Sequence, residues 1–320
     1  MLLAVVIVAA WLGWALLLPI RPAQTRFVML KPGLSTRHIA IELQANDVIR
    51  SWRAFLLYHY AVNRRSLKAG EYKFDDAESA LTVHDRLIRG DVYVHTVVIP
   101  EGFTMFDIAN AIQAAGLGSK QEFLSQAEHD VSLVHDLDPQ ATTLEGYLFP
   151  DTYGFTRTQT MQDIVGVMVR RFHQEAKQIG LNGDVHRLVT LASIVEKETA
   201  APEERPLVAG VYLNRLQKGM ALDADPTVIY AALLAGRYQG QITRADLLSS
   251  SAYNTYKNPG LPPGPVANPG KASLLAAMNP TKSDYLYFVS DNNGHHRFAR
   301  TLDEHSHNVA LYRRAVAGTQ

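Results

Sequence analysis

The stretch HRLVTLASIVEKETA, from His186 to Ala200, has the apolar spacing of a helix that packs on one side. Its apolar positions recur every three or four residues and are Leu188, Leu191, Ala192, Val195 and Thr199. At about 100° per residue, Glu196 and Glu198 lie about 160° apart and flank this stripe on opposite sides. The two carboxylates therefore cannot serve one site as a pair.

A carboxyl group at the margin of a core has two alternative roles. Partial burial raises a carboxyl pKa and suits a general acid, whereas a boundary salt bridge involves no chemistry. The spacing alone favours the salt bridge. Further acidic candidates are Glu145 and Asp151 in LEGYLFPDTY, and Asp223 and Asp225 in LDADPT. The aromatic run inside LEGYLFPDTY suits a sugar-binding cleft, but it also fits the end of a core strand.

The chain after this helix changes to turns and then to a hairpin. Val208–Leu216 keeps helical spacing, and Asn258–Gly270 (NPGLPPGPVANPG) is dense in Pro and Gly. Because proline stiffens a chain and tyrosines precede this segment, we expect a rigid loop packed along a cleft; a flexible linker is the alternative. Tyr285–Ser290 and Arg297–Ala299 then read as strands around an Asn-Asn-Gly turn, and a helix closes the chain.

The chain before the helix repeats itself once. Val28–Val48 matches Val97–Leu117, with Gly33 aligned to Gly102. Each copy has a short β-branched strand, a Gly turn and a helix that starts at Ser or Thr. We therefore predict two α+β modules of about 70 residues that arose by duplication; chance similarity of two amphipathic helices is the alternative. Strand–helix–helix–strand modules of this kind resemble LysM domains, which bind glycans.

The N-terminal stretch Leu2–Ile20 contains no charged side chain. As a helix it would be roughly 28 Å long, close to the hydrocarbon core of about 30 Å. We predict a transmembrane anchor. The alternatives are a buried core helix and a cleaved signal peptide, whose apolar region is usually shorter and ends at an A-x-A-like site. The basic residues after the span point to the cytoplasm under the positive-inside rule, but large C-terminal domains translocate largely regardless of charge.

Composition excludes several classes of protein. A length of 320 residues suggests about two domains, and 47% hydrophobic residues suffice for packed cores. The 31 basic residues balance 31 acidic ones, so nothing indicates a nucleic-acid partner. There is no cysteine, and the C-terminal histidines show no metal-ligand spacing. P-loop, G-x-S-x-G and G-x-G-x-x-G motifs are absent as well. We expect no metal and no cofactor.

Six strings in fixed order carry a family resemblance. They are LEGYLFPDTY, ASIVEKET, VYLNRL, DPTVIY, YNTY and GLPPGP, and they begin at Leu144, Ala192, Val211, Asp225, Tyr253 and Gly260. A weaker H-x-F-x-x-T-x-x-x-H pattern follows from His296 to His305. Together they resemble the YceG-like endolytic murein transglycosylases. The resemblance covers nearly the whole chain and is specific, because six motifs of four to ten residues occur in fixed order.

The resemblance implies a domain plan and a location. The fold class is α+β: a transmembrane helix over residues 1–20, a LysM-like module over 21–95, and a mixed α+β catalytic domain over 96–320, of which 96–165 is the second repeat copy. The family implies a single-pass protein of the bacterial inner membrane with its catalytic domain in the periplasm. It would act on peptidoglycan glycan strands beside peptidoglycan synthases (penicillin-binding proteins) and terminate nascent strands.

The resemblance also implies the chemistry. Glu196, the first Glu of ASIVEKET, would protonate the oxygen between N-acetylmuramic acid and N-acetylglucosamine. The resulting carboxylate would then accept the proton of the muramyl C6 hydroxyl, which attacks C1 and leaves a 1,6-anhydro end. Residues that match family motifs would bind the glycan: Glu145, Tyr147, Asp225, Thr227, Tyr253, Asn254 and Tyr256.

Two rival functions remain at this stage. A hydrolase on the same scaffold would use Asp225 or Glu145 to activate water and would leave a reducing end. A non-catalytic glycan-binding protein would keep the LysM-like modules and tolerate the loss of Glu196.

Overall fold

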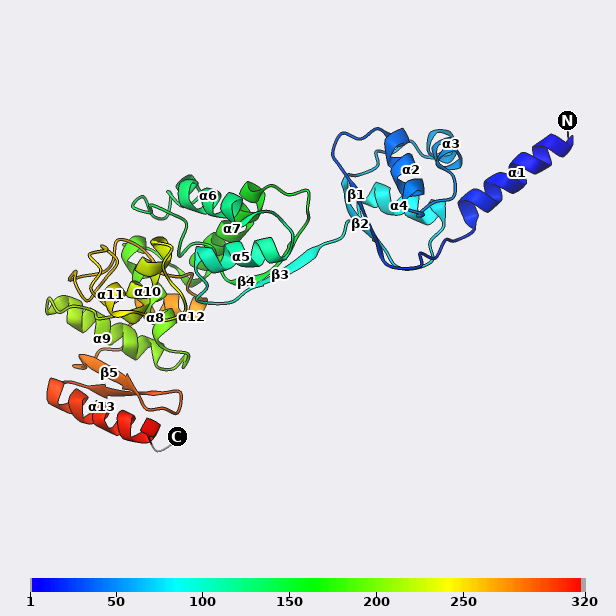
Figure 1. Ribbon diagram of the computed structural model, residues 1–320. Coiled ribbons are helices and arrows are strands. Elements are labelled where there is room, and N and C mark those ends of the chain that lie inside the picture. Colours follow the sequence, from blue (N-terminus) through cyan, green and yellow to red (C-terminus); the bar gives the residue numbers. More distant parts are fainter. Residues whose placement is uncertain (1, 318–320) are drawn as a thin grey trace. The chain divides into compact units, whose positions relative to one another are not determined.

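Residues 2–317 are described by a computed structural model, which combines helices with three separate two-stranded sheets (Figure 1). The expected α+β class is therefore confirmed. The chain divides into two units. Unit 1 runs to Thr96 and includes Gly154–Thr160, and unit 2 comprises Val97–Tyr153 and the chain from Met161 onward.

Unit 1 is built around one antiparallel strand pair. Strand β1 (Arg26–Leu30) pairs with β2 (Gly70–Phe74), so that Val28 lies opposite Tyr72. Alternate β1 residues, Val28 and Leu30, point into the core, as the period of two in a strand requires. The helices of this unit are α1 (Leu2–Leu17), α2 (Thr36–Ala45), α3 (Trp52–Val62) and α4 (Ala80–Arg89).

Serine side chains set where the helices of unit 1 begin. Ser35, Ser51 and Ser79 each accept a hydrogen bond from a backbone N–H in the first turn of α2, α3 and α4. Such caps satisfy donors that the helix itself leaves unpaired. The helices then cover the strand pair, and Leu43, Phe55 and Leu87 are fully buried against it.

The predicted membrane span coincides with α1, but only in part. The helix has 16 residues, and the chain leaves it before Ile20. Within residues 2–317, no helix combines the length and the hydropathy needed to cross a membrane. The anchor over Leu2–Ile20 therefore stays a prediction.

Strands β3 (His95–Ile99) and β4 (Asp151–Phe155) form the second sheet. They are the two strands of a second β-α-α-β-α succession along the chain. Between and after them come α5 (Met105–Ala114), α6 (Lys120–His129), a short 3-10 turn (Val131–Leu133) and α7 (Met161–Ile179). Thr104 and Asp107 form a reciprocal cap at the start of α5. The element order thus repeats as the sequence alignment predicts.

The remainder of unit 2 packs around α8 (Val185–Glu198), the predicted central helix. Its neighbours are α9 (Arg205–Gln217), α10 (Asp225–Leu234) and α12 (Lys271–Met278), and α11 (Arg244–Leu247) packs beside α10. The apolar stripe is buried, with Leu191 at 1% and Val195 at 0% exposure. Residues 264–270 are also buried, which confirms a packed loop rather than a flexible linker.

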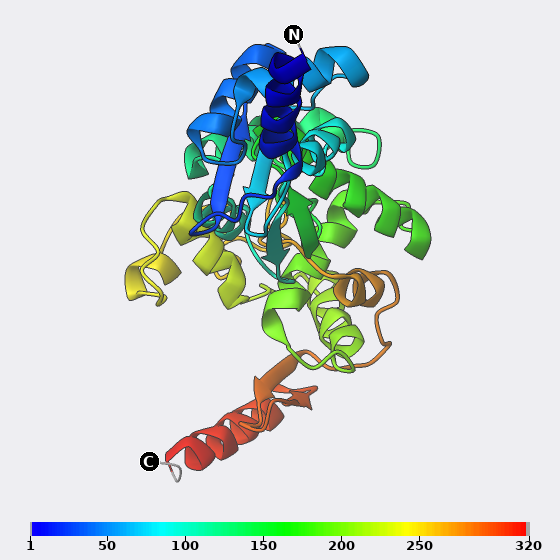
Figure 2. The ribbon, with the colours of Figure 1, turned by 90° about the vertical axis from the view of Figure 1, so that its right-hand side faces the viewer.

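The chain ends in a hairpin and a helix. Strands β5 (Tyr287–Ser290) and β6 (His296–Ala299) pair antiparallel, and α13 (Leu302–Ala317) packs on them (Figure 2). The predicted hairpin is confirmed, although its first strand starts two residues later than Tyr285. Asn214 on α9 ties this hairpin to the rest of unit 2, because its side-chain amide donates to the Ser283 and Tyr285 carbonyls.

Candidate active site

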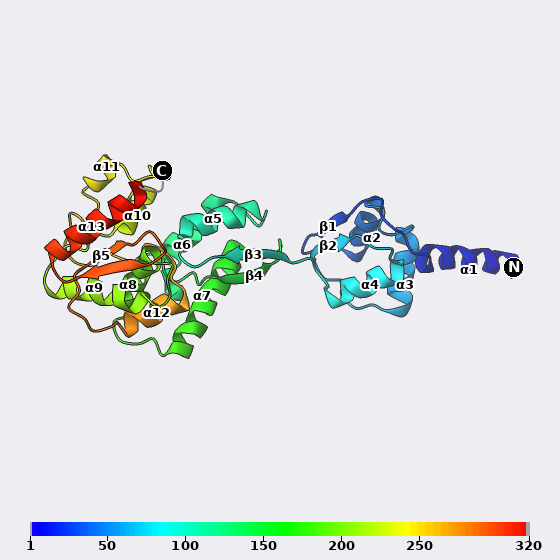
Figure 3. The same cartoon turned by 90° about the horizontal axis from the view of Figure 1, so that it is seen from below.

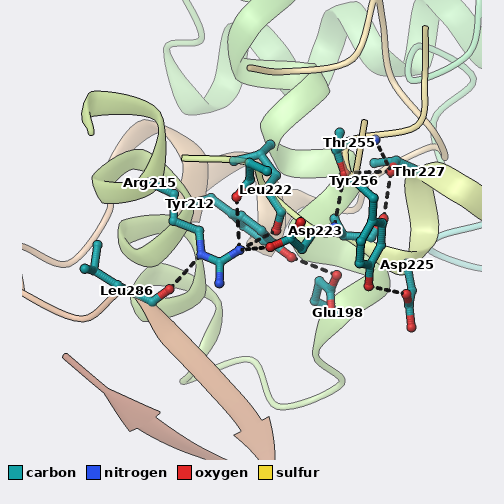
Figure 4. A network of polar contacts seen from close by, with 12 residues as sticks. Glu198, Tyr212, Arg215, Leu222, Asp223, Asp225, Thr227, Thr255, Tyr256 and Leu286 are labelled. Atoms are coloured by element: carbon teal, nitrogen blue, oxygen red, sulfur yellow. Dashed lines mark hydrogen bonds and ion pairs between the residues drawn. The ribbon is translucent and has the colours of Figure 1, made fainter. Parts of the chain in front are cut away.

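A cavity of about 390 Å³ lies at the C-terminal end of α8. Glu198 reaches its wall from α8, Tyr212 and Arg215 from α9, and Asp225 from the start of α10 (Figure 4). The opposite wall comes from the C-terminal hairpin and helix, with the aromatic side chains of Tyr287, Phe288 and His305. Segments more than 100 residues apart in the sequence therefore build one concave site, the common form of a ligand pocket.

Glu198 is the carboxyl best placed for acid–base chemistry in this cavity. The Tyr212 hydroxyl donates to its Oε1 at 2.7 Å. Burial raises the pKa of Glu198 to about 7, and the nearby Asp225 charge adds to this rise, while the Tyr212 hydrogen bond and Arg215 oppose it. A carboxyl with this pKa is present in both protonation states near neutral pH, which suits a general acid that later acts as a base.

Asp225 and Tyr256 form a second pair in the same cavity. The Tyr256 hydroxyl donates to Asp225 Oδ1 at 2.7 Å, and both residues line the cavity wall. Burial and the Asp225 carboxylate raise the pKa of Tyr256, so its hydroxyl stays protonated and keeps donating. The pair therefore presents fixed polar groups toward whatever occupies the cavity.

Arg215 holds three parts of the cavity wall together. Its Nε donates to the Leu286 carbonyl at 2.7 Å, and its Nη1 donates to the Leu222 carbonyl at 2.9 Å (Figure 4). Nη1 also contacts Asp223 Oδ2 at 3.2 Å, and the guanidinium lies 5.2 Å from the Tyr287 ring centre. Arg215 thus fixes α9, the turn before α10 and the hairpin relative to each other.

Glu196, the acid that the family resemblance implies, faces away from this cavity. Its Oε1 accepts a hydrogen bond from Arg205 Nη2 at 2.9 Å, and its Oε2 accepts one from the Gly270 N–H at 3.0 Å. The side chain is only 5% exposed. Arg205 also contacts Glu101 at 3.7 Å. Glu196 therefore neutralises a buried arginine and holds the start of α12, a role that matches the salt-bridge alternative.

Glu145 and Tyr147 lie inside the core of unit 2. The Glu145 carboxylate accepts hydrogen bonds from the Met105 N–H and from Asn268 Nδ2, and burial raises its pKa to about 8. The Tyr147 hydroxyl donates to buried Asp138. Both side chains are at most 1% exposed, so they hold distant segments together and do not line the cavity.

The remaining predicted binding residues divide into those that line the cavity and those that are buried or lie outside it. Thr227 is fully buried and shares a hydrogen bond with Thr255, next to the Asp225–Tyr256 pair (Figure 4). Asn254 is fully buried too, and its amide donates to the Ser249 carbonyl at 2.8 Å. Tyr253 packs against the Tyr230 ring outside the cavity. Of the seven predicted glycan-binding residues, only Asp225 and Tyr256 line the cavity beside Glu198.

The sequence interpretation did not assign a role to Tyr212, Arg215 or the hairpin aromatics. Tyr212 and Arg215 are the second and fifth residues of the family string VYLNRL on α9, so the string was a usable signal. No group of three or more His, Asp or Glu side chains within residues 2–317 could hold a metal ion. The acid–base chemistry described above needs only the carboxyl and hydroxyl groups in place.

Comparisons with known proteins identify the family of this chain. The YceG-like family model matches residues 28–311. An endolytic murein transglycosylase of Bacillus subtilis is 35% identical over 302 residues, which is 87% of this chain and 82% of that protein. One from Streptococcus pneumoniae is 31% identical over 92% of this chain, and the alignment spans 60% of that longer relative.

A solved structure agrees with these sequence matches. The crystal structure of a YceG-like protein from Listeria monocytogenes is 34% identical, with a TM-score of 0.58, over 89% of this chain and 99% of that one. Family model, relatives and structure each cover most of the chain. The chain belongs to the YceG-like family, and like its transglycosylase relatives it is an enzyme of the lyase class.

Proposed function

We propose that this chain is an endolytic peptidoglycan lytic transglycosylase, which cleaves the β-1,4 bond between N-acetylmuramic acid and N-acetylglucosamine. The observation that carries the proposal is Glu198, a carboxyl with a pKa of about 7 on the wall of a 390 Å³ cavity. The names of the relatives supply the substrate class. The cavity supplies a group that can protonate a glycosidic oxygen.

The geometry favours Glu198 over Glu196 as the acid. Glu196 already accepts from Arg205 and from the Gly270 N–H, one on each carboxylate oxygen. Both carboxylate oxygens of Glu196 are thus already occupied, whereas an acid catalyst must offer an oxygen to its substrate. Within residues 2–317, Glu198 accepts one hydrogen bond, from Tyr212 on Oε1. Its second oxygen is free to serve a substrate.

One carboxyl suffices for the whole reaction. Protonated Glu198 gives its proton to the bridging oxygen, the C1–O bond breaks, and C1 develops oxocarbenium character. The Glu198 carboxylate then accepts the proton of the muramyl C6 hydroxyl while the C6 oxygen bonds to C1. The acid is regenerated, no water is consumed, and the product has a 1,6-anhydro end. Ordinary glycosidases need a second carboxylate for their nucleophile or water.

The neighbouring groups have supporting roles in this scheme. Tyr212 donates to Glu198 Oε1, which fixes the direction of the carboxyl and stabilises its ionised form after proton transfer. Asp225, held by Tyr256, presents an acceptor to glycan hydroxyls or amides. Phe288 adds an aromatic side chain to the cavity wall, and the Tyr287 ring beside it is held between neighbours, since it contacts Arg215 and stacks with His305.

A hydrolase is the second candidate, because Asp225 provides another carboxylate in the same cavity. In that case Asp225 would activate a water molecule and the product would have a reducing end. Mass spectrometry of glycan strands digested by the purified chain separates the two reactions. Anhydro ends, lost in the Glu198→Gln variant, support the transglycosylase; reducing ends would establish the hydrolase, and no cleavage would leave a glycan-binding protein.

We propose in addition that the chain is a single-pass protein of the inner membrane with its catalytic unit in the periplasm, where it terminates nascent strands beside penicillin-binding proteins. The uncharged stretch Leu2–Ile20 supports the anchor, and unit 1 would serve as its LysM-like module. A periplasm-dependent reporter fused after Gln320 should be active, and the protein should remain in the membrane fraction. A soluble product cleaved near Ala23 would contradict the anchor.

A further inference from the structure

The second helices of the two repeat copies, α3 and α6, provide an internal comparison. Four exposed positions of each helix fall at the same spacing, beginning at the second helical residue; Val62 on α3 and Glu122 on α6 are exposed in addition. On α3 these positions are Arg53, Leu57, Tyr60 and Ala61. On α6 they are Gln121, Ser125, Glu128 and His129. The same place in the module is therefore polar in one copy, and apolar with a basic edge in the other.

The outward face of α3 is unusual for a surface helix. Leu57 is 51% and Tyr60 50% exposed, and Val62 at the end of the helix is also open to solvent. Surface helices normally turn polar residues outward, as α6 does. Apolar side chains grouped on an exposed face mark an interaction surface.

Charge identifies the kind of partner. Between Val48 and Gly70 there are five basic residues and no acidic one. Arg53, Arg64 and Arg65 are exposed, and none of them pairs with a carboxylate within residues 2–317. An apolar face bordered by unpaired arginines complements anionic lipid headgroups, which attract basic segments near a membrane.

The position of α3 also favours a membrane. The last turn of α1 packs against α3 and α4, and Ala15 is buried there. Arg50, just before α3, donates to the Leu18 and Pro19 carbonyls and lies over the Trp14 ring. In Figures 1 and 3, α3 lies at the end of unit 1 from which α1 projects. The surface of α3 is thus next to the most apolar segment of the chain.

From these observations we infer that the exposed face of α3 binds the lipid surface, with Leu57 and Tyr60 in the headgroup region and the arginines on anionic phosphates. The inference rests on the proposed membrane anchor and goes beyond it, because it assigns a second contact that fixes how unit 1 meets the bilayer. Aromatic residues favour this interfacial zone. Tyr60 belongs to the exposed face of α3, and the rings of Trp14 and Trp52 lie under Arg50 and Arg53.

The absence of cysteine allows a direct test, since any introduced cysteine is the only site for a thiol label. Leu57→Cys and the matched position Ser125→Cys are labelled with an environment-sensitive fluorophore in the full chain. The chains are reconstituted into phosphatidylcholine vesicles with or without phosphatidylglycerol. We expect a blue shift at position 57, together with quenching by brominated lipid that is stronger with phosphatidylglycerol. Position 125 should respond only to aqueous iodide.

The outcomes separate the two proposals. Suppose that the chain floats with vesicles but iodide quenches the label at position 57 as strongly as the label at position 125. The α3 surface would then be refuted as a lipid contact, while the anchor would stand. This result would also point to a protein partner for α3. If the chain does not float, both proposals fail. Combined Arg53→Gln, Arg64→Gln and Arg65→Gln changes should abolish the phosphatidylglycerol dependence at position 57 while flotation persists, and an unchanged dependence would exclude the arginines as the lipid contact.

Discussion

The two sides of the last turn of α8 place two glutamates in different surroundings. On one side, Glu196 is neutralised by Arg205 and fixed by the backbone of Gly270. On the other, Glu198 faces a cavity and accepts a hydrogen bond from the Tyr212 hydroxyl. Two identical side chains, two residues apart, thus have different surroundings: Glu196 is ion-paired with Arg205, whereas burial raises the pKa of Glu198 to about 7.

This difference shows how one helix can serve structure and chemistry at the same time. Glu196 fixes the loop that ends at Gly270 and so keeps α8 in place. Burial of Glu198 is only partly offset by Tyr212 and Arg215, so its pKa rises to about 7 and a proton stays available near neutral pH. The comparison can be tested by changing each side separately.

The largest effect should come from Glu198→Gln. The amide keeps the shape of the carboxyl but has no transferable proton, so turnover on glycan strands should fall by about 10²–10⁴-fold. Glu196→Gln is the matched control and should stay within a few-fold of wild type. Rates of anhydro-end formation measure both. Should Glu196→Gln prove the more damaging change while the fold persists, the assignment of the two carboxyls would be reversed.

Stability should respond to the same two variants with opposite signs. The folded-state pKa of Glu198, about 7, is above its ordinary value of 4.5. Its contribution to stability is therefore complete below pH 4.5 and is lost as pH rises through 7. At pH 8, Glu198→Gln should increase the free energy of unfolding by up to about 3 kcal/mol. Glu196→Gln should decrease it by about 1–3 kcal/mol, because Arg205 loses a charged partner. Denaturant titrations at pH 5 and pH 8 test both signs.

The pH dependence of the rate should move in opposite directions in two neighbouring variants. Tyr212→Phe removes a hydrogen bond that lowers the pKa of Glu198, so the fall in activity at alkaline pH should shift to higher pH. Asp225→Asn removes a charge that raises the same pKa, so the fall should begin at a lower pH. Shifts of the same sign in both variants would show that another group controls the profile.

The smallest effect should come from Gly270→Ala, on the Glu196 side. A methyl group there would come within 1.9 Å of Glu101 Oε1. Glu101 is about half exposed and can turn outward, so a stability loss of about 1 kcal/mol is expected, measured by the thermal midpoint. The alkaline limb of the activity profile should not move. A shifted limb would show that the two sides of α8 are coupled.

Local patterns in the sequence determined much of this protein. Apolar spacing predicted α8 and its buried stripe, the alignment of the two copies predicted the repeated strand–helix–helix–strand order, and the Pro-rich segment was correctly interpreted as a packed loop. These features depend on a few successive residues, since helical and strand periods and proline geometry act over short distances. The same spacing correctly predicted that Glu196 and Glu198 face different surroundings.

Only the tertiary structure decided which of the two carboxyls faces the cavity. The angle between two side chains around a helix is a local property. Arg205 contacts Glu196 and Tyr212 contacts Glu198 only because α9 folds back against α8. Glu145 is a similar case. The aromatic motif that contains it suits a sugar-binding site, yet its carboxylate is buried in the core, where it accepts a hydrogen bond from Asn268, 123 residues away. A carboxyl's pKa depends on the dielectric and the charges within a few ångströms, and packing rather than sequence order determines those neighbours.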